Sequence, residues 1–308
     1  MAPRVIRRRK KNGRIFIISF VVTLALLLGA TAFVILNRPT GIPTYHLPAQ
    51  VPSYQAAWAK YVPEDFVQLS IINYTMIRQL NASAVPTTNL LDLIKPNISV
   101  TPDMVKAEEN IQFQAPNATV SLVFLTSSAF SQFAAPVADA YGLSLTGKPL
   151  TFISDVSISG LDYTGWMALV PGDHVVAFAN GDNLGIGALN ESLEAANGTL
   201  ANVLQRTDVR QSLYVVNASG PLLSLGIQNY AGLVQSGNMT MISVTDVAGT
   251  IHVTYVVKFV SSEVAKAQTS YMKSAYLSAT TFAQYDQYLE ATQYQPFSDM
   301  SGAVRFVG

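Results

Sequence analysis

The chain has 308 residues, of which 49% are hydrophobic, and its 19 basic and 19 acidic side chains give a formal net charge of zero. It contains no cysteine. That absence excludes disulfides, zinc–thiolate sites, iron–sulfur clusters, blue copper centres and thiol nucleophiles.

The N-terminal region combines a basic arm with a long apolar run. Residues 1–14 hold seven Arg and Lys and no acidic residue, and residues 15–36 read IFIISFVVTLALLLGATAFVIL, without a charge. Because a helix of about 20 apolar residues crosses a bilayer, residues 15–36 are predicted to be a transmembrane helix whose partner is the lipid bilayer. The basic arm on one side predicts a cytoplasmic N-terminus and an extracytoplasmic C-terminal domain, as in a single-pass protein of the cell membrane.

A cleaved signal peptide is the alternative interpretation of this region. The small-x-small pattern of Ala30-Thr31-Ala32 would place the cleavage after Ala32. The apolar run continues to Leu36 and exceeds the usual length of a signal peptide's apolar segment, which favours a retained signal anchor. Under either interpretation the C-terminal part is exported.

Residues 37–53 contain four prolines and are predicted to form an extended spacer. Beyond residue 38 the chain has eleven basic and nineteen acidic side chains, which give this part a net charge of −8. Since nucleic-acid binding depends on basic side chains that neutralise phosphates, no nucleic-acid partner is expected.

Eight Asn-x-Ser/Thr acceptor sites for glycosylation follow the apolar run, more than this composition produces by chance. They lie at Asn73, Asn81, Asn97, Asn117, Asn190, Asn197, Asn217 and Asn238. The excess predicts a glycoprotein. A cysteine-free, sequon-rich exported chain is typical of an archaeal-like cell envelope.

The rest of the chain is predicted to be an α+β ectodomain with two similar halves, residues 54–160 and 161–308. In each half a Pro-x-Asp or Pro-Glu-Asp turn opens a strand-like run, at 63–67 and at 171–175. Each half then reads strand, helix, strand, strand, helix, strand, which is the β-α-β-β-α-β order of a ferredoxin-like fold with an antiparallel sheet. The predicted strands are 66–73, 108–115, 118–126, 150–158, 174–180, 212–217, a hairpin over 239–260, and 303–307, and the predicted helices of the first half are 74–82 and 128–141.

Three local signals in the second half are strong. The segment 251–260 alternates apolar and polar residues, and Ala248-Gly249 before it predicts a tight hairpin turn. Ser262 is predicted to be the N-cap of a helix. Gly198, next to the acceptor Asn197, is expected to end the helical pattern of 188–206.

His174, His252 and Asp173 are weak candidates for a metal site. If the first and third strands of that half lay side by side in parallel, the two histidines would lie at the same end of the sheet, with Asp173 beside them. Solvated or structural histidines are the competing interpretation, and no metal or other cofactor is predicted.

Two motifs that resemble catalytic or phosphate-binding elements have simpler explanations. Ser270 and Lys273 match the SxxK spacing of serine hydrolases, but they fall in mid-helix and the companion motifs are missing. The spacing of three glycines, Gly181, Gly185 and Gly187, fits neither the GxGxxG nor the GxxxxGK pattern of phosphate-binding loops. These glycines indicate a turn between a strand and a helix. No catalytic residue is predicted.

The segment 271–297 is rich in aromatic residues. Phe282, Tyr285 and Leu289 would share one face of a helix, which is typical of packing against a sheet. Tyrosines also suit a surface that recognises a glycan or a protein, because they combine area with a polar tip.

These features predict a noncatalytic binding or scaffolding protein, anchored by one transmembrane helix, with a possible role as an accessory subunit of a membrane complex. Gly29, Ala30 and Ala32 would let a second spanning helix pack closely. An extracytoplasmic hydrolase and a metal or solute receptor are the alternatives.

Overall fold

The computed structural model describes residues 41–53, 56–80, 101–114, 118–158, 161–217, 222–229, 237–275 and 281–296. The chain divides into two compact units, residues 1–42 and residues 43–308. Every helix and strand below belongs to the second unit.

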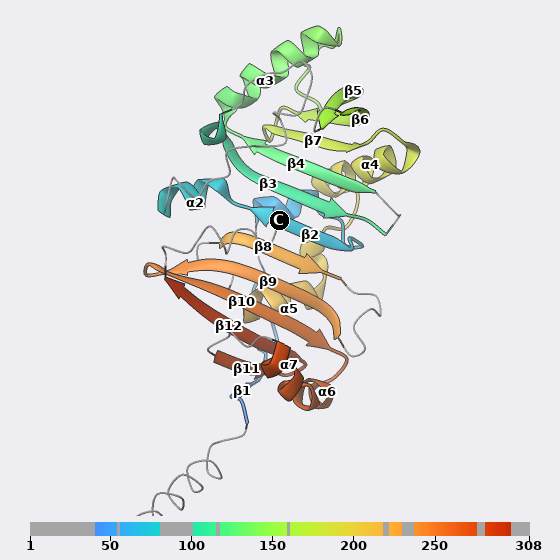
Figure 1. The fold of residues 1–308 in the computed structure, drawn as a ribbon. Coiled ribbons are helices and arrows are strands. Elements are labelled where there is room, and N and C mark those ends of the chain that lie inside the picture. The colour runs from blue at the N-terminus through green and yellow to red at the C-terminus, as the bar shows by residue number, and fades with distance from the viewer. Residues whose placement is uncertain are drawn as a thin grey trace, which may run out of the picture. The chain divides into compact units, whose positions relative to one another are not determined.

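One sheet contains all twelve described strands, in the order β1-β11-β12-β10-β9-β8-β2-β3-β4-β7-β6-β5 (Figure 1). The sheet is mixed, since β1 runs parallel to β11 and the other neighbours are antiparallel. The strands are β1 Thr44–Tyr45, β2 Gln68–Ile72, β3 Val105–Gln112, β4 Thr119–Leu125, β5 Leu150–Ile158, β6 Leu161–Val170, β7 Val175–Asn180, β8 Leu222–Gln228, β9 Gly237–Val247, β10 Thr250–Phe259, β11 Thr281–Tyr285 and β12 Tyr288–Pro296.

The single sheet corrects the prediction of two ferredoxin-like halves with separate antiparallel sheets. In a ferredoxin-like half, the first helix would carry the chain across to a parallel strand. Here α2 (Tyr74–Leu80) is short, and β3 returns antiparallel beside β2. The two parts of the sheet then join where β8 pairs with β2. The expected boundary at 160/161 also falls inside the antiparallel pair β5–β6.

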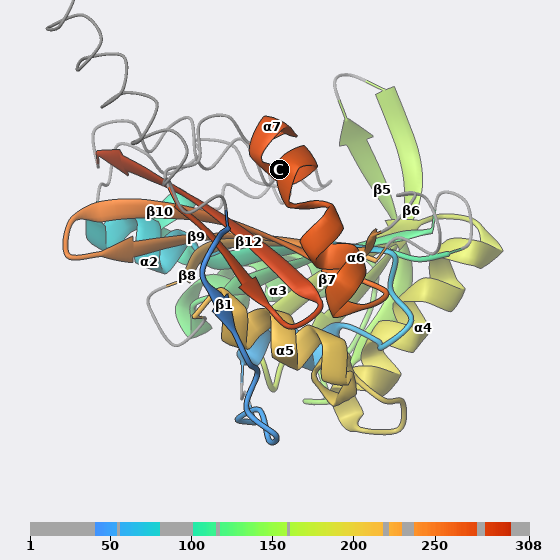
Figure 2. The same cartoon turned by 90° about the horizontal axis from the view of Figure 1, so that it is seen from below.

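Helices cover both faces of the sheet. The α5 face is the one against which η1 (Ala57–Tyr61), α4 (Asn183–Asn197), η5 (Val203–Gln205) and α5 (Thr207–Val215) pack. The opposite face, called the α3 face, is covered by α2 and by α3 (Ser127–Ala140). Figure 2 shows α4 and α5 on one side of the sheet, with α6 (Ser262–Ala267) and α7 (Thr269–Ala275) on the other. The remaining helical turn is η4 (Pro102–Met104).

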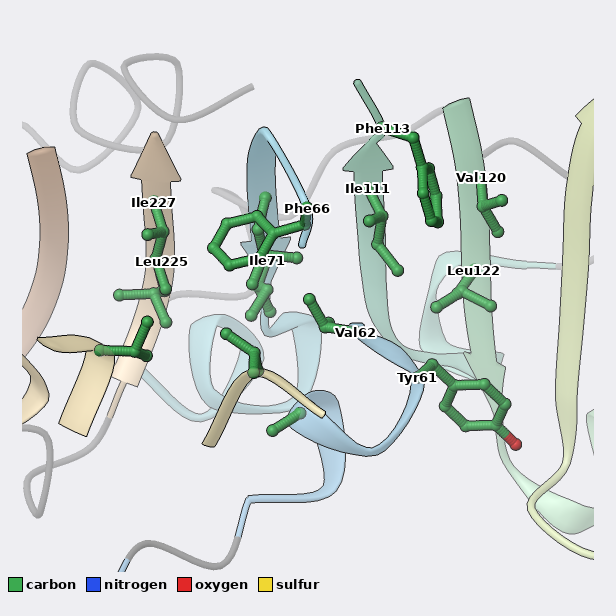
Figure 3. Packing of buried hydrophobic residues seen from close by; sticks show 14 of the residues in the cluster. Tyr61, Val62, Phe66, Ile71, Ile111, Phe113, Val120, Leu122, Leu225 and Ile227 are labelled. Carbon is green, nitrogen blue, oxygen red and sulfur yellow. The ribbon is translucent and has the colours of Figure 1, made fainter. Parts of the chain in front are cut away.

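The hydrophobic core on the α5 face is continuous across the junction of β2 and β8. Figure 3 shows Leu225 of β8, Ile71 of β2 and Ile111 of β3 on the same side of the sheet, near Val62. These side chains are buried. Since apolar area removed from water is the main favourable term in folding, this shared core stabilises both parts of the sheet together.

The strong local signals in the sequence predict several elements correctly. The hairpin β9–β10 turns at Ala248 (φ 51°) and Gly249 (φ 81°), a two-residue turn with both residues in the left-handed region. Helix α4 ends at Asn197, and Gly198 takes the left-handed conformation, with φ 81°. The helix expected after Ser262 begins at Ser262, but its N-cap is Ser261, whose Oγ accepts from the backbone N–H of Val264 at 3.3 Å.

Other predictions of secondary structure are wrong. The segment 212–217, predicted as a strand, belongs mainly to α5, and the aromatic segment predicted as a helix forms the hairpin β11–β12. Strands β6 and β8 are not among the predicted strands. The predicted strand 303–307 lies outside the described residues.

The prediction of a single-pass membrane protein with an extracytoplasmic domain is not supported. Within the described ranges, no helix is both long enough and apolar enough to cross a membrane. The longest one there, α4, has 15 residues, about 22 Å at 1.5 Å per residue, against a hydrocarbon core of about 30 Å. The segment 15–36, which carried the prediction, lies outside the described residues.

Candidate functional site

The structure does not bring the predicted metal ligands together. His252 lies on β10 and His174 immediately before β7, and these strands are six positions apart in the sheet, about 29 Å at a strand spacing of about 4.8 Å. The ring centroid of His174 lies 5.8 Å from that of Phe130, and the ring centroid of His252 lies 4.6 Å from that of Tyr294. Among the described residues, no group of three or more His, Asp or Glu could hold a metal ion.

Asp173 belongs to an ion pair. Its Oδ2 accepts hydrogen bonds from Lys60 Nζ and Tyr61 OH, each at 2.5 Å. Burial opposes ionisation of this carboxyl, but the hydrogen bonds and the charge of Lys60 lower its pKa overall. Asp173 therefore fixes η1 against the turn between β6 and β7.

The other candidate motifs occupy ordinary positions. Ser270 and Lys273 are both exposed on α7. Gly185 allows a close approach between β7 and α4, because a Cβ there would lie 2.0 Å from the carbonyl oxygen of Asn180. A Cβ on Gly181 would likewise lie 2.4 Å from the carbonyl oxygen of Thr164, whereas Gly187 has open space around it.

The predicted glycosylation sites divide between described and undescribed parts of the chain. Asn190, Asn197, Asn217 and Asn238 are exposed, and Asn73 is half-buried beside the start of α2. Asn81, Asn97 and Asn117 lie outside the described residues. The exposed four are sterically open to modification, and occupancy of any of the eight stays a prediction.

A cluster of tyrosines around one carboxyl group lies at the β1–β11–β12 edge of the sheet. The tyrosine cluster consists of Tyr45 (β1), Tyr214 (α5) and Tyr285 (β11) together with Glu290 (β12). The rings of Tyr45 and Tyr285 stack with centroids 5.0 Å apart and planes 28° apart. Two tyrosines of the cluster are open to solvent, since Tyr45 is 49% and Tyr214 38% exposed.

Strand register explains why these residues meet. Tyr45 is the parallel neighbour of Tyr285, and Glu290 is paired with Ala283, two residues before Tyr285. Because side chains alternate along a strand, Tyr45, Tyr285 and Glu290 all point to the α5 face. Tyr214 reaches the same face from the helix.

Helix α5 is fixed above this part of the sheet by polar contacts. The Oδ2 of Asp208 accepts from Lys258 Nζ at 3.3 Å and from Arg206 at 2.7 Å, and Tyr288 OH donates to Oε1 of Gln211 at 2.7 Å. Burial opposes ionisation of Asp208, but the hydrogen bond and charge of Arg206, with those of Lys258, lower its pKa overall. A charged, hydrogen-bonded network therefore sets the position of Tyr214.

Glu290 is the acceptor at the centre of the tyrosine cluster. Its Oε1 accepts from Thr292 Oγ1 at 2.8 Å, and Tyr285 OH also donates to its carboxyl. Behind it, the hydroxyls of Thr292 and Thr254 lie 3.2 Å apart. Burial raises the pKa of Glu290, and burial with the nearby Glu290 charge raises the pKa of Tyr285 to about 12. The arrangement offers ring faces beside hydroxyl groups and a carboxyl.

Sequence reasoning located only part of this cluster. It marked the aromatic segment that contains Tyr285 but assigned it to a helix, with Phe282, Tyr285 and Leu289 on one face. In the hairpin, Phe282 and Leu289 point to the α3 face and Tyr285 to the other. Tyr288, Glu290 and Thr292 stand at every second position, and this period of two favours a strand over a helix. No local signal links Tyr45 or Tyr214 to them.

Comparisons with known proteins leave the family open. No family model matches the sequence, and no curated protein matches it. Among solved structures, crystal form I of TP0453 shares 9% identity, covers 84% of this chain and 99% of that chain, and has a TM-score of 0.46. Crystal form III of TP0453 also shares 9% identity, covers 83% of this chain and 99% of that chain, and has a TM-score of 0.44. A likeness at this level carries no functional inference.

Proposed function

We propose that the unit of residues 43–308 is a noncatalytic binding module, and that it binds a saccharide at the tyrosine cluster. The observation that carries this proposal is the stack of the exposed Tyr45 on the half-buried Tyr285, beside the carboxyl of Glu290. Tyrosine is favoured at recognition surfaces because one side chain supplies both a rigid apolar face and a polar tip.

The chemistry of the cluster matches a polyhydroxylated ring. A saccharide has apolar C–H faces that pack on aromatic rings, and hydroxyl groups that donate to a carboxylate and exchange hydrogen bonds with tyrosine hydroxyls. Tyr45 and Tyr214 supply the exposed faces, and Glu290 supplies the acceptor. A few polar groups beside aromatic surface are the usual composition of a site for a small ligand.

Binding is favoured over catalysis by how Glu290 is held. Its carboxyl already accepts hydrogen bonds from Tyr285 and Thr292, and Glu290 is the one carboxyl group in the tyrosine cluster. Hydrolysis of a glycosidic bond usually requires two carboxyl groups that flank the bond. The cluster therefore suits recognition.

The test is binding of the full-length chain to a panel of immobilised mono- and oligosaccharides, followed by titration of those retained. Tyr45→Ala and Tyr214→Ala are each expected to weaken binding at least tenfold, about 1.4 kcal/mol. Tyr271→Ala is the matched control, because Tyr271 is 65% exposed on α7, on the other face of the sheet.

Retention of no saccharide would contradict the proposal. Equal weakening by Tyr45→Ala and by the Tyr271→Ala control would also contradict it, because the binding surface would then lie elsewhere.

A further inference from the structure

The two outer edges of the sheet differ in length. Strand β1 at one edge has two residues, whereas β5 at the other edge has nine, and β5 pairs with β6 along its whole length. Among the strands that the structure describes, none pairs with the outer side of β5. An outermost strand presents a row of backbone N–H and C=O groups to which another strand can add.

Strand β5 has few of the devices that usually protect such an edge. Its sequence, LTFISDVSI, has no proline and no lysine, and Asp155 is its single charged residue. Natural edge strands are commonly shortened, charged or interrupted by proline to prevent pairing with another chain. A nine-residue edge with one charged residue and no proline is therefore suited to pairing.

The middle of β5 exposes an apolar side chain. Ile153 is 49% exposed, whereas the adjacent Phe152 is buried and the hydroxyl of Ser154 lies 3.0 Å from that of Tyr141, both on the other face. Ile153 is paired with Trp166 of β6 and so points to the α5 face. On that face α4 packs on β4, β6 and β7, and Ile153 of β5 remains exposed.

We propose that β5 is a homodimer interface, in which the β5 strands of two copies pair antiparallel about a two-fold axis at Ile153. A closed two-fold contact uses the same patch on both copies, so each residue meets a partner fixed by the register. The result is one sheet continuous through both copies.

The side chains of β5 favour this register. With the axis at Ile153, the antiparallel register places the exposed Ile153 opposite its own counterpart, Phe152 opposite Ser154, and Thr151 opposite position 155. With the axis at Asp155, two like charges would lie opposite each other, which is destabilising. With the axis at Ser154, Asp155 would face the apolar Ile153. Of these three registers, the one centred on Ile153 alone brings the exposed Ile153 against its own counterpart and keeps position 155 away from both itself and Ile153.

The dimer leaves the proposed binding site accessible. The tyrosine cluster lies on β1, β11 and β12, at the opposite end of the strand order from β5. Each dimer would carry two copies of that surface. The inference about β5 does not depend on what the tyrosine cluster binds.

The absence of cysteine makes a direct test possible, because one introduced thiol is the single thiol of the chain. Directly opposed Cα atoms in an antiparallel pair lie about 4.5–5.5 Å apart, within the range of about 4.4–6.8 Å that a disulfide spans. The full-length Ile153→Cys variant, mildly oxidised, is expected to form a reducible dimer on a denaturing gel. Val247→Cys is the control, since Val247 on β9 has a similar exposure of 48%.

A second variant tests the unmodified interface. Ile153→Lys places two like charges at the axis and is expected to convert the dimer to a monomer in sedimentation equilibrium, with an unchanged circular dichroism spectrum. Cross-linking of Ile153→Cys at no greater rate than Val247→Cys would overturn the proposal. So would a monomeric mass for the unsubstituted chain at micromolar concentration.

Discussion

At the scale of single residues, Glu109 is the largest departure from the usual composition of a core. It lies on β3 between Ile71 of β2 and Leu122 of β4, it is buried, and neither of its carboxyl oxygens has a hydrogen-bond partner within the described part of the chain. Burial raises the pKa of Glu109 well above its ordinary value. The carboxyl is therefore best accommodated with its proton on.

This burial predicts an unusual dependence of stability on pH. Because the pKa of Glu109 is higher in the folded state, the unfolded chain releases its proton first as pH rises from about 4.3, the ordinary value for Glu. The contribution of Glu109 to the free energy of unfolding therefore falls from about pH 4.3 up to its folded-state pKa.

Glu109→Gln removes this titration and keeps the shape of the side chain. At pH 7 it is expected to raise the free energy of unfolding by about 1–3 kcal/mol, with little effect near pH 4. Urea unfolding of both proteins at several pH values measures the difference. A gap that stays constant with pH would show that the carboxyl of Glu109 ionises alike in both states.

At the scale of elements, the helices and the hairpin that the sequence predicts correctly are marked by capping or turn residues within a few positions of their ends. Thr126 caps α3, with its Oγ1 accepting from the N–H of Ala129 at 3.2 Å, and Asp182 caps α4, with its Oδ1 accepting from the N–H of Gly185 at 2.7 Å. The turn of the β9–β10 hairpin is equally local. Strand β12, in contrast, contains Leu289, Glu290 and Ala291, residues that also favour a helix, and only its partners β10 and β11 make it a strand.

The β9–β10 turn gives a prediction at this scale. Ala248 has φ 51°, a conformation that costs alanine energy and that asparagine tolerates, and Gly249 follows it. Ala248→Asn is expected to raise the free energy of unfolding by about 0.5–1 kcal/mol, and Gly249→Ala to lower it by about 1 kcal/mol. Thermal unfolding of the two variants measures opposite shifts. A shift in the same direction would contradict the assignment of the turn.

At the scale of the whole unit, long-range pairing decides what local patterns cannot. Strand β2 pairs with β8 through partners such as Ile71 and Leu225, which lie far apart in the sequence, and this pairing joins two groups of strands into one sheet. The tyrosine cluster depends on similar distances, since Tyr45, Tyr214 and Tyr285 come from three separate parts of the chain. A single sequence holds no signal for either association, so both had to be found in the structure.

The continuous core on the α5 face predicts cooperative unfolding. Both tryptophans, Trp58 before β2 and Trp166 on β6, lie on one side of the β2–β8 junction, whereas circular dichroism reports on the whole sheet. Unfolding in urea is expected to give the same midpoint by tryptophan fluorescence and by circular dichroism. Midpoints that differ would mean that the two parts of the sheet unfold separately.

The most direct test of saccharide binding at the tyrosine cluster is hydroxyl-radical footprinting of the full-length chain with and without each saccharide of the panel. Tyrosine side chains covered by a ligand are oxidised more slowly. With a bound saccharide, Tyr45 and Tyr214 are predicted to be protected, and Tyr271 on the other face is predicted to react at its original rate. Unchanged oxidation of Tyr45 and Tyr214 with every saccharide, or protection at Tyr271 instead, would contradict the proposed function.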